Sequence, residues 1–581
     1  MHPIAHTDRW RRRHDRAPGG HHREYANPGR SLQPKAPDCG SRLIPDIVSQ
    51  CCGKAARLLA DVTVCLLLVM AVPGLARAGE AAEAAVTIAS GPIRGQAADG
   101  LRRFLGIPYA APPVGTLRWQ PPQSVAAWTA PRDCTHFGPA CPQPRQRPDG
   151  ASSEDCLTLN VWTPATRPGE KLPVMVWIHG GAFNFGASSQ PEYDGANLAR
   201  HGVVVVTINY RLGPLGFFVH PRLAAASDRH VSGNYGLLDQ IAALTWVRQN
   251  IAAFGGDAGN VTIFGQSAGA RSVSLLVLSP LAKGLFHRAI AQSGGPILGS
   301  EYLNPAFNGD MAAVSAMGQK LADRLGCSAA TEVLACLRKK SAQEVVTAAA
   351  CSTGLFDTGL FFAPVLDGRV LPDNPLTAYA AGRQQAVPMI VGSTRNEGTL
   401  YLAEEKNLTL EKYKTFLNAR FGAEATSALA MFPAKRDADV PAAIDHVIAV
   451  AANAQPARFV ASSQARLGVP AYLYQFTRRP DTDKARTLGA HHGADLAYVF
   501  GNMSPADGYT DTDKALSDTM LAYWVQFAKT GNPNGQGLPP WPQYESVSDK
   551  NMDFGDTVSV KEHLYKKQCD YIRIHSRFEQ H

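Results

Sequence analysis

Residues 261–278 read VTIFGQSAGARSVSLLVL, and this stretch is the strongest indication of the fold in the sequence. Its first four residues have the β-branched and aromatic side chains of a buried strand, and residues 270–278 have the composition of a helix. Between the two, Gly265 and Gly269 flank Ser267 in a G-x-S-x-G pattern. A strand that turns sharply into a helix exposes such a serine, and the glycines permit the close backbone approach. The stretch therefore predicts a nucleophilic serine at a strand end.

Short apolar runs recur along the chain and are separated by segments of helix length. The runs lie at residues 174–178, 203–208, 387–391 and 471–476. One intervening segment, residues 237–251, carries apolar residues at helical spacing. Such an order predicts an α/β fold, in which a large, mostly parallel central sheet has helices on both faces. No linker or repeat divides residues 79–581, so we expect one domain with its extra length inserted at strand ends.

A second glycine motif follows the strand predicted at residues 174–178. Gly180 and Gly181 come directly after this strand, where bare backbone N–H groups can face a ligand. With the N–H of Ala268, they could hold the negative charge that forms on a carbonyl oxygen, each donor contributing ~3 kcal/mol in the transition state. The alternative is a simple Gly-Gly turn. Because the chain has both this glycine motif and the predicted serine turn, an oxyanion hole is the favoured interpretation.

A serine hydroxyl needs a base to take its proton, and the base needs a carboxylate to orient it. His491 and His492 lie in a loop after the strand predicted at residues 471–476, and Glu397 comes shortly after the strand predicted at residues 387–391. The chain order Ser, Glu, His is that of the α/β-hydrolases. Each of these side chains could instead be a solvated loop residue. The order and the strand context favour a catalytic triad, but they do not decide between the two histidines.

The first 78 residues read as a leader. They carry a net charge of +6, and the whole chain carries +8. Residues 79–581 are therefore nearly neutral and offer no basic face for nucleic acid. An apolar run at residues 62–72 follows Lys54 and Arg57 and precedes Ala-Arg-Ala at residues 76–78, the order of a cleaved signal peptide. At 11 residues the run is too short to span a bilayer.

We therefore expect residues 54–78 to be a signal peptide and the protein to be secreted or periplasmic. Residues 1–53 are interpreted as a disordered extension or as the result of a mis-assigned start, and residues 79–581 as the hydrolase domain. The chain shows no Cys/His cluster at metal-ligand spacing, and serine chemistry needs no cofactor, so neither a metal nor a cofactor is expected.

Six sequence blocks resemble the type-B carboxylesterase/lipase family, which includes bacterial para-nitrobenzyl esterases and animal cholinesterases. They lie at residues 104–119, 153–164, 176–186, 208–218, 254–270 and 489–502, in the family's order. The resemblance implies the α/β-hydrolase fold and a small-molecule ester as substrate. It places the nucleophile, acid and base on Ser267, Glu397 and His492, which leaves His491 without a catalytic role. The oxyanion donors fall on Gly180, Gly181 and Ala268.

The resemblance also implies structural pairs. Disulfides are expected between Cys141 and Cys156 and between Cys327 and Cys336. Buried ion pairs are expected between Arg118 and Glu154 and between Arg211 and Asp239. Seven cysteines follow residue 78, so at least one stays outside a disulfide, and no partner is assigned to Cys134, Cys351 or Cys569.

Two departures from the family bear on specificity. Gln266 precedes the serine where the family usually has Glu, and the loop at residues 141–156 holds no aromatic residue. Cholinesterases have a tryptophan in that loop, which binds the quaternary ammonium by cation–π attraction. We therefore expect an exported serine esterase for neutral esters. An amidase or lactonase on the same site, or an inactive adhesion or binding protein on the same fold, are the alternatives. The sequence leaves the natural ester and the oligomeric state open.

Overall fold

The computed structural model describes residues 82–144, 152–298, 311–350, 355–356, 359–403 and 405–575. The chain divides into two compact units, Met1–Arg77 and Ala78–His581. The predicted extension at residues 1–53 and the predicted signal peptide at residues 54–78 lie outside the described residues. Across the described ranges, no helix combines the length and the apolar character needed to cross a membrane.

A 13-stranded sheet forms the centre of the second unit. Its parallel part runs in the order β7, β6, β8, β9, β10, β11 and β12. These strands are β6 (Leu172–Ile178), β7 (Val204–Ile208), β8 (Gly256–Gln266), β9 (Arg288–Gln292), β10 (Met389–Thr394), β11 (Ala471–Phe476) and β12 (Lys550–Phe554). Antiparallel strands extend both edges: β1 (Ala82–Ile88), β2 (Gly91–Ala98), β3 (Leu101–Pro108) and β5 (Thr158–Thr163) on one side, and β13 (Val558–Glu562) on the other. The short strand β4 (Arg132–Asp133) pairs with β2.

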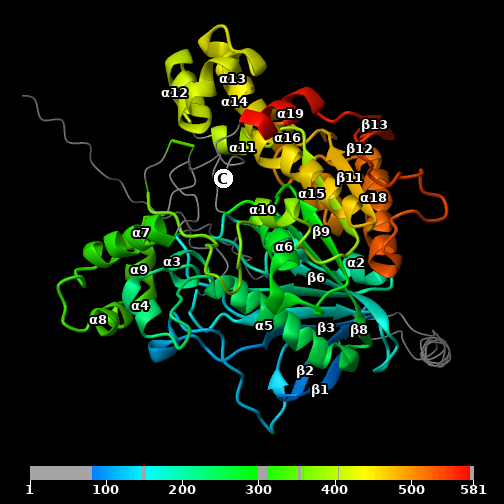
Figure 1. Cartoon of the computed structure of the whole chain (residues 1–581). Helices are drawn as coiled ribbons and strands as arrows, with labels where there is room; N and C mark the ends of the chain where they lie inside the picture. The colour runs from blue at the N-terminus through cyan, green and yellow to red at the C-terminus, as the bar shows by residue number, and fades with distance from the viewer. Residues whose placement is uncertain are drawn as a thin grey trace, which may run out of the picture. The chain divides into compact units, whose positions relative to one another are not determined.

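Both faces of the central sheet are buried, which explains why strands such as β6 have apolar side chains on both faces. In β6, Val174, Val176 and Ile178 belong to one hydrophobic cluster, and Met175 and Trp177 belong to the other. The first cluster is completed by α5 (Tyr235–Asn250), α6 (Ala268–Leu278) and α15 (Gln455–Arg466). Figure 1 shows these three helices in front of the sheet. The second is completed by α2 (Ala196–Arg200), α17 (Leu496–Phe500) and α18 (Asp511–Thr530). The predicted layers of helices on both faces are confirmed.

Two helical excursions leave the sheet at strand ends. The first follows β9 and contains α7 (Met311–Arg324), α8 (Val333–Lys339), α9 (Ala342–Ala349) and α10 (Pro375–Ala380). The second follows β10 and contains α11 (Thr399–Leu402), α12 (Leu410–Phe421), α13 (Ala425–Met431) and α14 (Val440–Ile448). A fully buried π-helical segment, η7 (Ala449–Ala454), joins α14 directly to α15. The extra length of the domain is therefore inserted after parallel strands, next to where their ends meet.

Candidate active site

Ser267 occupies a sharp turn between β8 and α6. Its φ of 59° and ψ of −123° lie in a region that side chains other than glycine rarely adopt. A Cβ added to Gly269 would lie 1.9 Å from the carbonyl oxygen of Ile178, and one added to Gly265 would lie 2.6 Å from the carbonyl carbon of Gly269. Only glycine fits at these two positions, so the motif brings β6, β8 and α6 together beneath the half-buried serine.

The glycine loop after β6 lies directly against this serine. A Cβ added to Gly180 would lie 3.1 Å from the Cβ of Ser267. Gly181 has a φ of +106°, and its carbonyl oxygen accepts hydrogen bonds from the backbone N–H groups of Asn184 and Phe185 at 2.9 and 3.0 Å. A side chain at Gly181 would collide with the carbonyl oxygen of Phe185, at 1.9 Å. The loop is thus fixed in a fold that puts the Gly180 backbone beside Ser267.

Glu397 and His492 are in direct contact. The carboxylate of Glu397 is fully buried; Oε1 accepts the N–H of Thr394 at 2.6 Å, and Oε2 shares a short hydrogen bond with Nδ1 of His492. Residues Asn396 and His491 form a backbone bridge between the two loops, and the N–H of Asn396 donates to Ala490 at 2.9 Å. The second nitrogen of His492, Nε2, is buried without a hydrogen-bond partner among the described residues.

Asp445 on α14 holds the Glu397 loop from behind. It accepts the N–H of Gly398 at 2.7 Å and the side-chain amide of Asn396 at 3.0 Å. Burial raises the pKa of Asp445, and these hydrogen bonds oppose the rise. Sequence reasoning missed this residue, because no local pattern connects a helix position with a loop 47 residues earlier.

His491 differs from its neighbour in its surroundings. Burial, helped by the charge of Lys484, lowers the pKa of His491 to about 4. Its Nδ1 lies 3.3 Å from the carbonyl oxygen of Gly489, whereas the contact with Glu397 is made by His492. A histidine that stays neutral and points to backbone serves the packing of the loop.

Tyr401 and Arg271 also lie near Ser267, and neither was predicted from the sequence. The ring of Tyr401 is 5.7 Å from the ring of His492, and the Ser267 side chain is close enough to act on the pKa of the Tyr401 phenol. Burial raises the pKa of Tyr401 to about 12, and the charge of Arg271 opposes that rise. Tyr401 follows Glu397 by four residues and Arg271 follows Ser267 by four, so helical spacing from each predicted catalytic residue could have pointed to them.

The sequence profile of the Carboxylesterase family matches residues 82–572. The chain belongs to the carboxylesterase family. Fumonisin B1 esterase of Sphingopyxis macrogoltabida is 37% identical to this carboxylesterase over 491 residues, covering 82% of this chain and 87% of the relative. The para-nitrobenzyl esterase of Bacillus subtilis (strain 168) is 36% identical over 492 residues, covering 82% of this chain and 96% of the relative.

Solved structures agree with this membership. A PNB esterase superposes with a TM-score of 0.73 at 35% identity, and the match covers 84% of this chain and 99% of that one. The predicted family resemblance and the α/β-hydrolase fold are confirmed. The protein is a carboxylic ester hydrolase.

Three residues after His492, this carboxylesterase buries a third carboxylate, that of Asp495. Oδ2 of Asp495 accepts the amide of Gln292 at 3.0 Å and the hydroxyl of Tyr474 at 2.8 Å. Burial raises the pKa of Asp495. Gln266 lies in register with Gln292 on the neighbouring strand, and its Nε2 is buried without a partner among the described residues. The side chain directly before Ser267 is thus neutral and buried.

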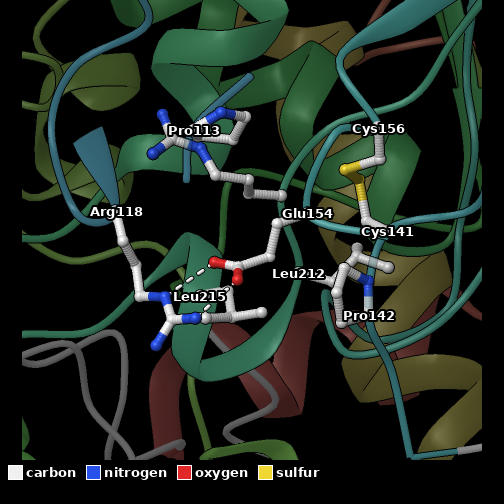
Figure 2. Close-up of a pocket in the computed structure, with 9 residues that line it drawn as sticks. Pro113, Arg118, Cys141, Pro142, Glu154, Cys156, Leu212 and Leu215 are labelled. Carbon is white, nitrogen blue, oxygen red and sulfur yellow. Dashed lines mark hydrogen bonds and ion pairs between the residues drawn. A yellow bond between two sulfur atoms is a disulfide. The ribbon is translucent and has the colours of Figure 1, made fainter. Parts of the chain in front are cut away.

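The structural pairs implied by the family resemblance are present in the structure. Arg118 donates to Glu154 at 2.7 Å, and Figure 2 shows this pair in a small pocket beside the Cys141–Cys156 disulfide. Arg211 binds Asp239 through two nitrogens at 2.7 and 2.8 Å. A second disulfide joins Cys327 and Cys336. Cys134 and Cys569 are buried thiols, and Cys351 lies outside the described residues.

Proposed function

We propose that this carboxylesterase works through a covalent acyl-enzyme on Ser267. His492 is its general base, Glu397 orients the imidazole, and the N–H groups of Gly180, Gly181 and Ala268 bind the oxyanion. The observation that carries the proposal is the contact between Glu397 and His492, at the same end of the sheet as the serine turn. Only the geometry of a triad needs this combination of a buried carboxylate, a histidine with a vacant Nε2 and a strained serine.

The acylation step follows from these positions. Nε2 of His492 accepts the Ser267 proton while Oγ forms a bond to the ester carbon, and the carbonyl electron pair moves to oxygen. The three N–H groups stabilise this oxyanion, each by ~3 kcal/mol. When the carbonyl re-forms, the bond to the alcohol oxygen breaks, and the alcohol leaves with the proton from His492.

Deacylation repeats the cycle with water. His492 takes a proton from water, whose oxygen bonds to the acyl carbon. Collapse of the second oxyanion breaks the bond to Oγ, which regains the proton from His492 and releases the carboxylic acid. Glu397 stabilises the imidazolium in both half-reactions. Neither the acylation step nor the deacylation step, as written here, requires a metal or an organic cofactor.

A single-turnover experiment tests the acyl-enzyme. p-Nitrophenyl acetate should give a burst of one p-nitrophenol per enzyme, and peptide mapping after a rapid acid quench should find the acetyl group on Ser267. An acetyl group on another residue, or no turnover at all, would contradict the mechanism. Turnover of matched anilides and lactones faster than esters would instead favour the amidase or lactonase alternatives.

We also propose that the enzyme is exported. The apolar run at residues 62–72 and the Ala-Arg-Ala pattern at residues 76–78 support cleavage, and the two disulfides are consistent with an oxidising compartment. Mass spectrometry of the mature protein should find its first residue at or near Gly79. An active enzyme that still carries residues 54–78 would contradict export by signal peptide.

Neutral esters should be preferred over choline esters. Gln266 offers no negative charge, and the loop at residues 141–156 offers no aromatic face to a quaternary ammonium group. We expect kcat/KM for 3,3-dimethylbutyl acetate to exceed that for acetylcholine by at least ~10-fold, which corresponds to about 1.4 kcal/mol. Comparable values for the two esters would show that another part of the site recognises the cation.

A further inference from the structure

Gln143 lies two residues after Cys141, which the disulfide to Cys156 fixes, and its side chain is buried. Its Nε2 donates to the carbonyl oxygens of Cys141 and Gly186, each at 3.0 Å, and its Oε1 accepts the backbone N–H of Gly186 at 3.0 Å. One amide side chain therefore binds both backbone polar groups of Gly186. Because the two residues are 43 positions apart in the chain, this contact joins two separate loops.

Gly186 lies at the end of the glycine loop that follows β6 and packs against the beginning of that loop. Its φ is +112°, and an added Cβ would lie 2.5 Å from Nδ1 of His179 and 2.8 Å from the carbonyl oxygen of Gly180. No side chain fits into this space, so the Gly186 backbone is in direct contact with the two residues. In such close packing, a shift of Gly186 must also move His179 and Gly180.

His179 determines the direction of one N–H group in the loop. Its Nδ1 hydrogen-bonds to the carbonyl oxygen of Gly180 at 2.8 Å. The imidazole is itself fixed, because it stacks on the ring of Tyr210, whose hydroxyl donates to the carbonyl oxygen of His179 at 2.9 Å. In a planar trans peptide, the C=O and the N–H that follows it point in opposite directions. The contact with His179 therefore directs the N–H of Gly181 away from the imidazole.

We propose that Gln143 is a positioning residue for the oxyanion hole: by holding Gly186, it aims the N–H groups of Gly180 and Gly181. The inference rests on the acyl-enzyme mechanism proposed above, in which these N–H groups bind the oxyanion. Gln143 acts through the Gly186 backbone and not on the substrate itself. Because the oxyanion forms only on the way to and from the tetrahedral intermediate, misplaced donors should lower kcat and change KM much less.

Gln143→Met tests the proposal, because methionine is of similar size and removes the hydrogen bonds to Gly186. Rates are expressed per active site, counted from the p-nitrophenol burst, so that misfolded protein does not lower them. We expect kcat for p-nitrophenyl acetate to fall about 10- to 100-fold, with KM changed by less than about 3-fold. The affinity for a trifluoromethyl ketone, whose adduct with Ser267 carries the same oxyanion, should fall by a similar factor. The acid-side decline of kcat/KM, which reports His492, should not move.

Gln464→Met is the matched control. Gln464 is also buried, and its Nε2 also donates to two backbone carbonyl oxygens, those of Gln385 and Val387, at 3.1 Å. This variant should unfold at a lower temperature than wild type but keep the wild-type kcat and the wild-type affinity for the trifluoromethyl ketone. Gln143→Glu gives a second measurement at the proposed position: it keeps an acceptor for the N–H of Gly186, loses both donated hydrogen bonds and should again lower kcat more than KM.

The proposal is overturned if kcat of Gln143→Met equals that of Gln464→Met, or if neither Gln143 variant folds. In both cases the side chain would stabilise the fold and not the oxyanion loop. A large loss of kcat in Gly181→Ala alone would then leave the oxyanion hole itself intact. Wild-type kcat in Gly181→Ala would instead contradict the oxyanion hole, so the two failures can be told apart.

Discussion

The serine turn and the acid–base pair reach the same site by different means. Ser267 is fixed within a few residues of chain, because Gly265 and Gly269 leave its backbone no other path between β8 and α6. Glu397 and His492 are 95 residues apart, and hydrogen bonds between two loops bring them together. The first part is set by local backbone sterics and the second by tertiary contacts. A substitution at a glycine of the serine turn should therefore abolish most activity, whereas a substitution that removes one hydrogen bond between the two loops should lower activity only in part.

The largest effect is expected when either part loses its reacting group. Ser267→Ala and His492→Ala should each lower kcat by ~10⁴ or more, and the double variant should be no worse, because the two side chains act as one unit. Thermal unfolding of Ser267→Ala should stay close to wild type, since catalysis needs the hydroxyl and packing does not. Steady-state kinetics with calorimetry measures both. A variant that kept a tenth of the activity would remove that residue from the triad.

Gly181→Ala tests how far local sterics control the glycine loop after β6, which lies against the serine turn. The added methyl group would lie 1.9 Å from the carbonyl oxygen of Phe185, so the loop must move and take its N–H groups away from the oxyanion. We expect kcat to fall by roughly 10²–10³ and stability to fall with it. Gly284→Ala is the control, because Gly284 also has a positive φ, +74°, but open space around its Cβ. Equal losses of kcat in both variants would exclude an oxyanion role.

Asp445→Asn should loosen the acid–base pair without removing any of its members. The amide would keep the shape but weaken the hydrogen bond to Gly398 and allow the Glu397 loop to shift. We expect kcat to fall about 10- to 100-fold, with KM changed much less. Asp367→Asn is the matched control: it is equally buried, at 8% exposure, and accepts backbone N–H groups in another turn. It should lose stability but not kcat; a similar loss of kcat there would refute the positioning role of Asp445.

The smallest effect on catalysis is expected at His491. Its pKa is lowered to about 4 in the folded state, below the ordinary value of ~6.5. The unfolded chain therefore binds a proton in this interval that the folded chain does not, and stability falls as pH drops from 6.5 toward 4, by up to roughly 3 kcal/mol.

His491→Asn should reduce that acid-induced loss of stability. Denaturant titrations at pH 7 and pH 4.5 would measure it. The acid-side decline of kcat/KM should stay where it is in wild type, because it reports protonation of His492, which removes the acceptor lone pair. A shift of that decline in His491→Asn would mean that the two histidines had been assigned the wrong way round.

The difference between the two parts also explains what could be predicted from sequence. The β8–Ser267–α6 turn is encoded in consecutive residues, and it was predicted with its strand and helix. The choice of His492 over His491 needed the family resemblance, since both stand in the same loop. Asp445 acts across a tertiary contact that no local pattern reveals, because it lies 47 residues from the Gly398 that it binds. β9 was missed because its five residues, RAIAQ, are short and begin and end with polar side chains.

The π-helical segment η7 determines how α14 is rotated about its own axis relative to α15. A π-helix carries more residues per turn than an α-helix, and such a segment behaves like one residue inserted into an otherwise regular helix. Deleting one residue from positions 449–454 would let a single α-helix run from α14 through α15, turning α14 by about 100° about its axis. Asp445 would then face away from Gly398. The position of Glu397, the proposed acid, thus depends on the length of a buried helix as much as on the chemistry of its own loop.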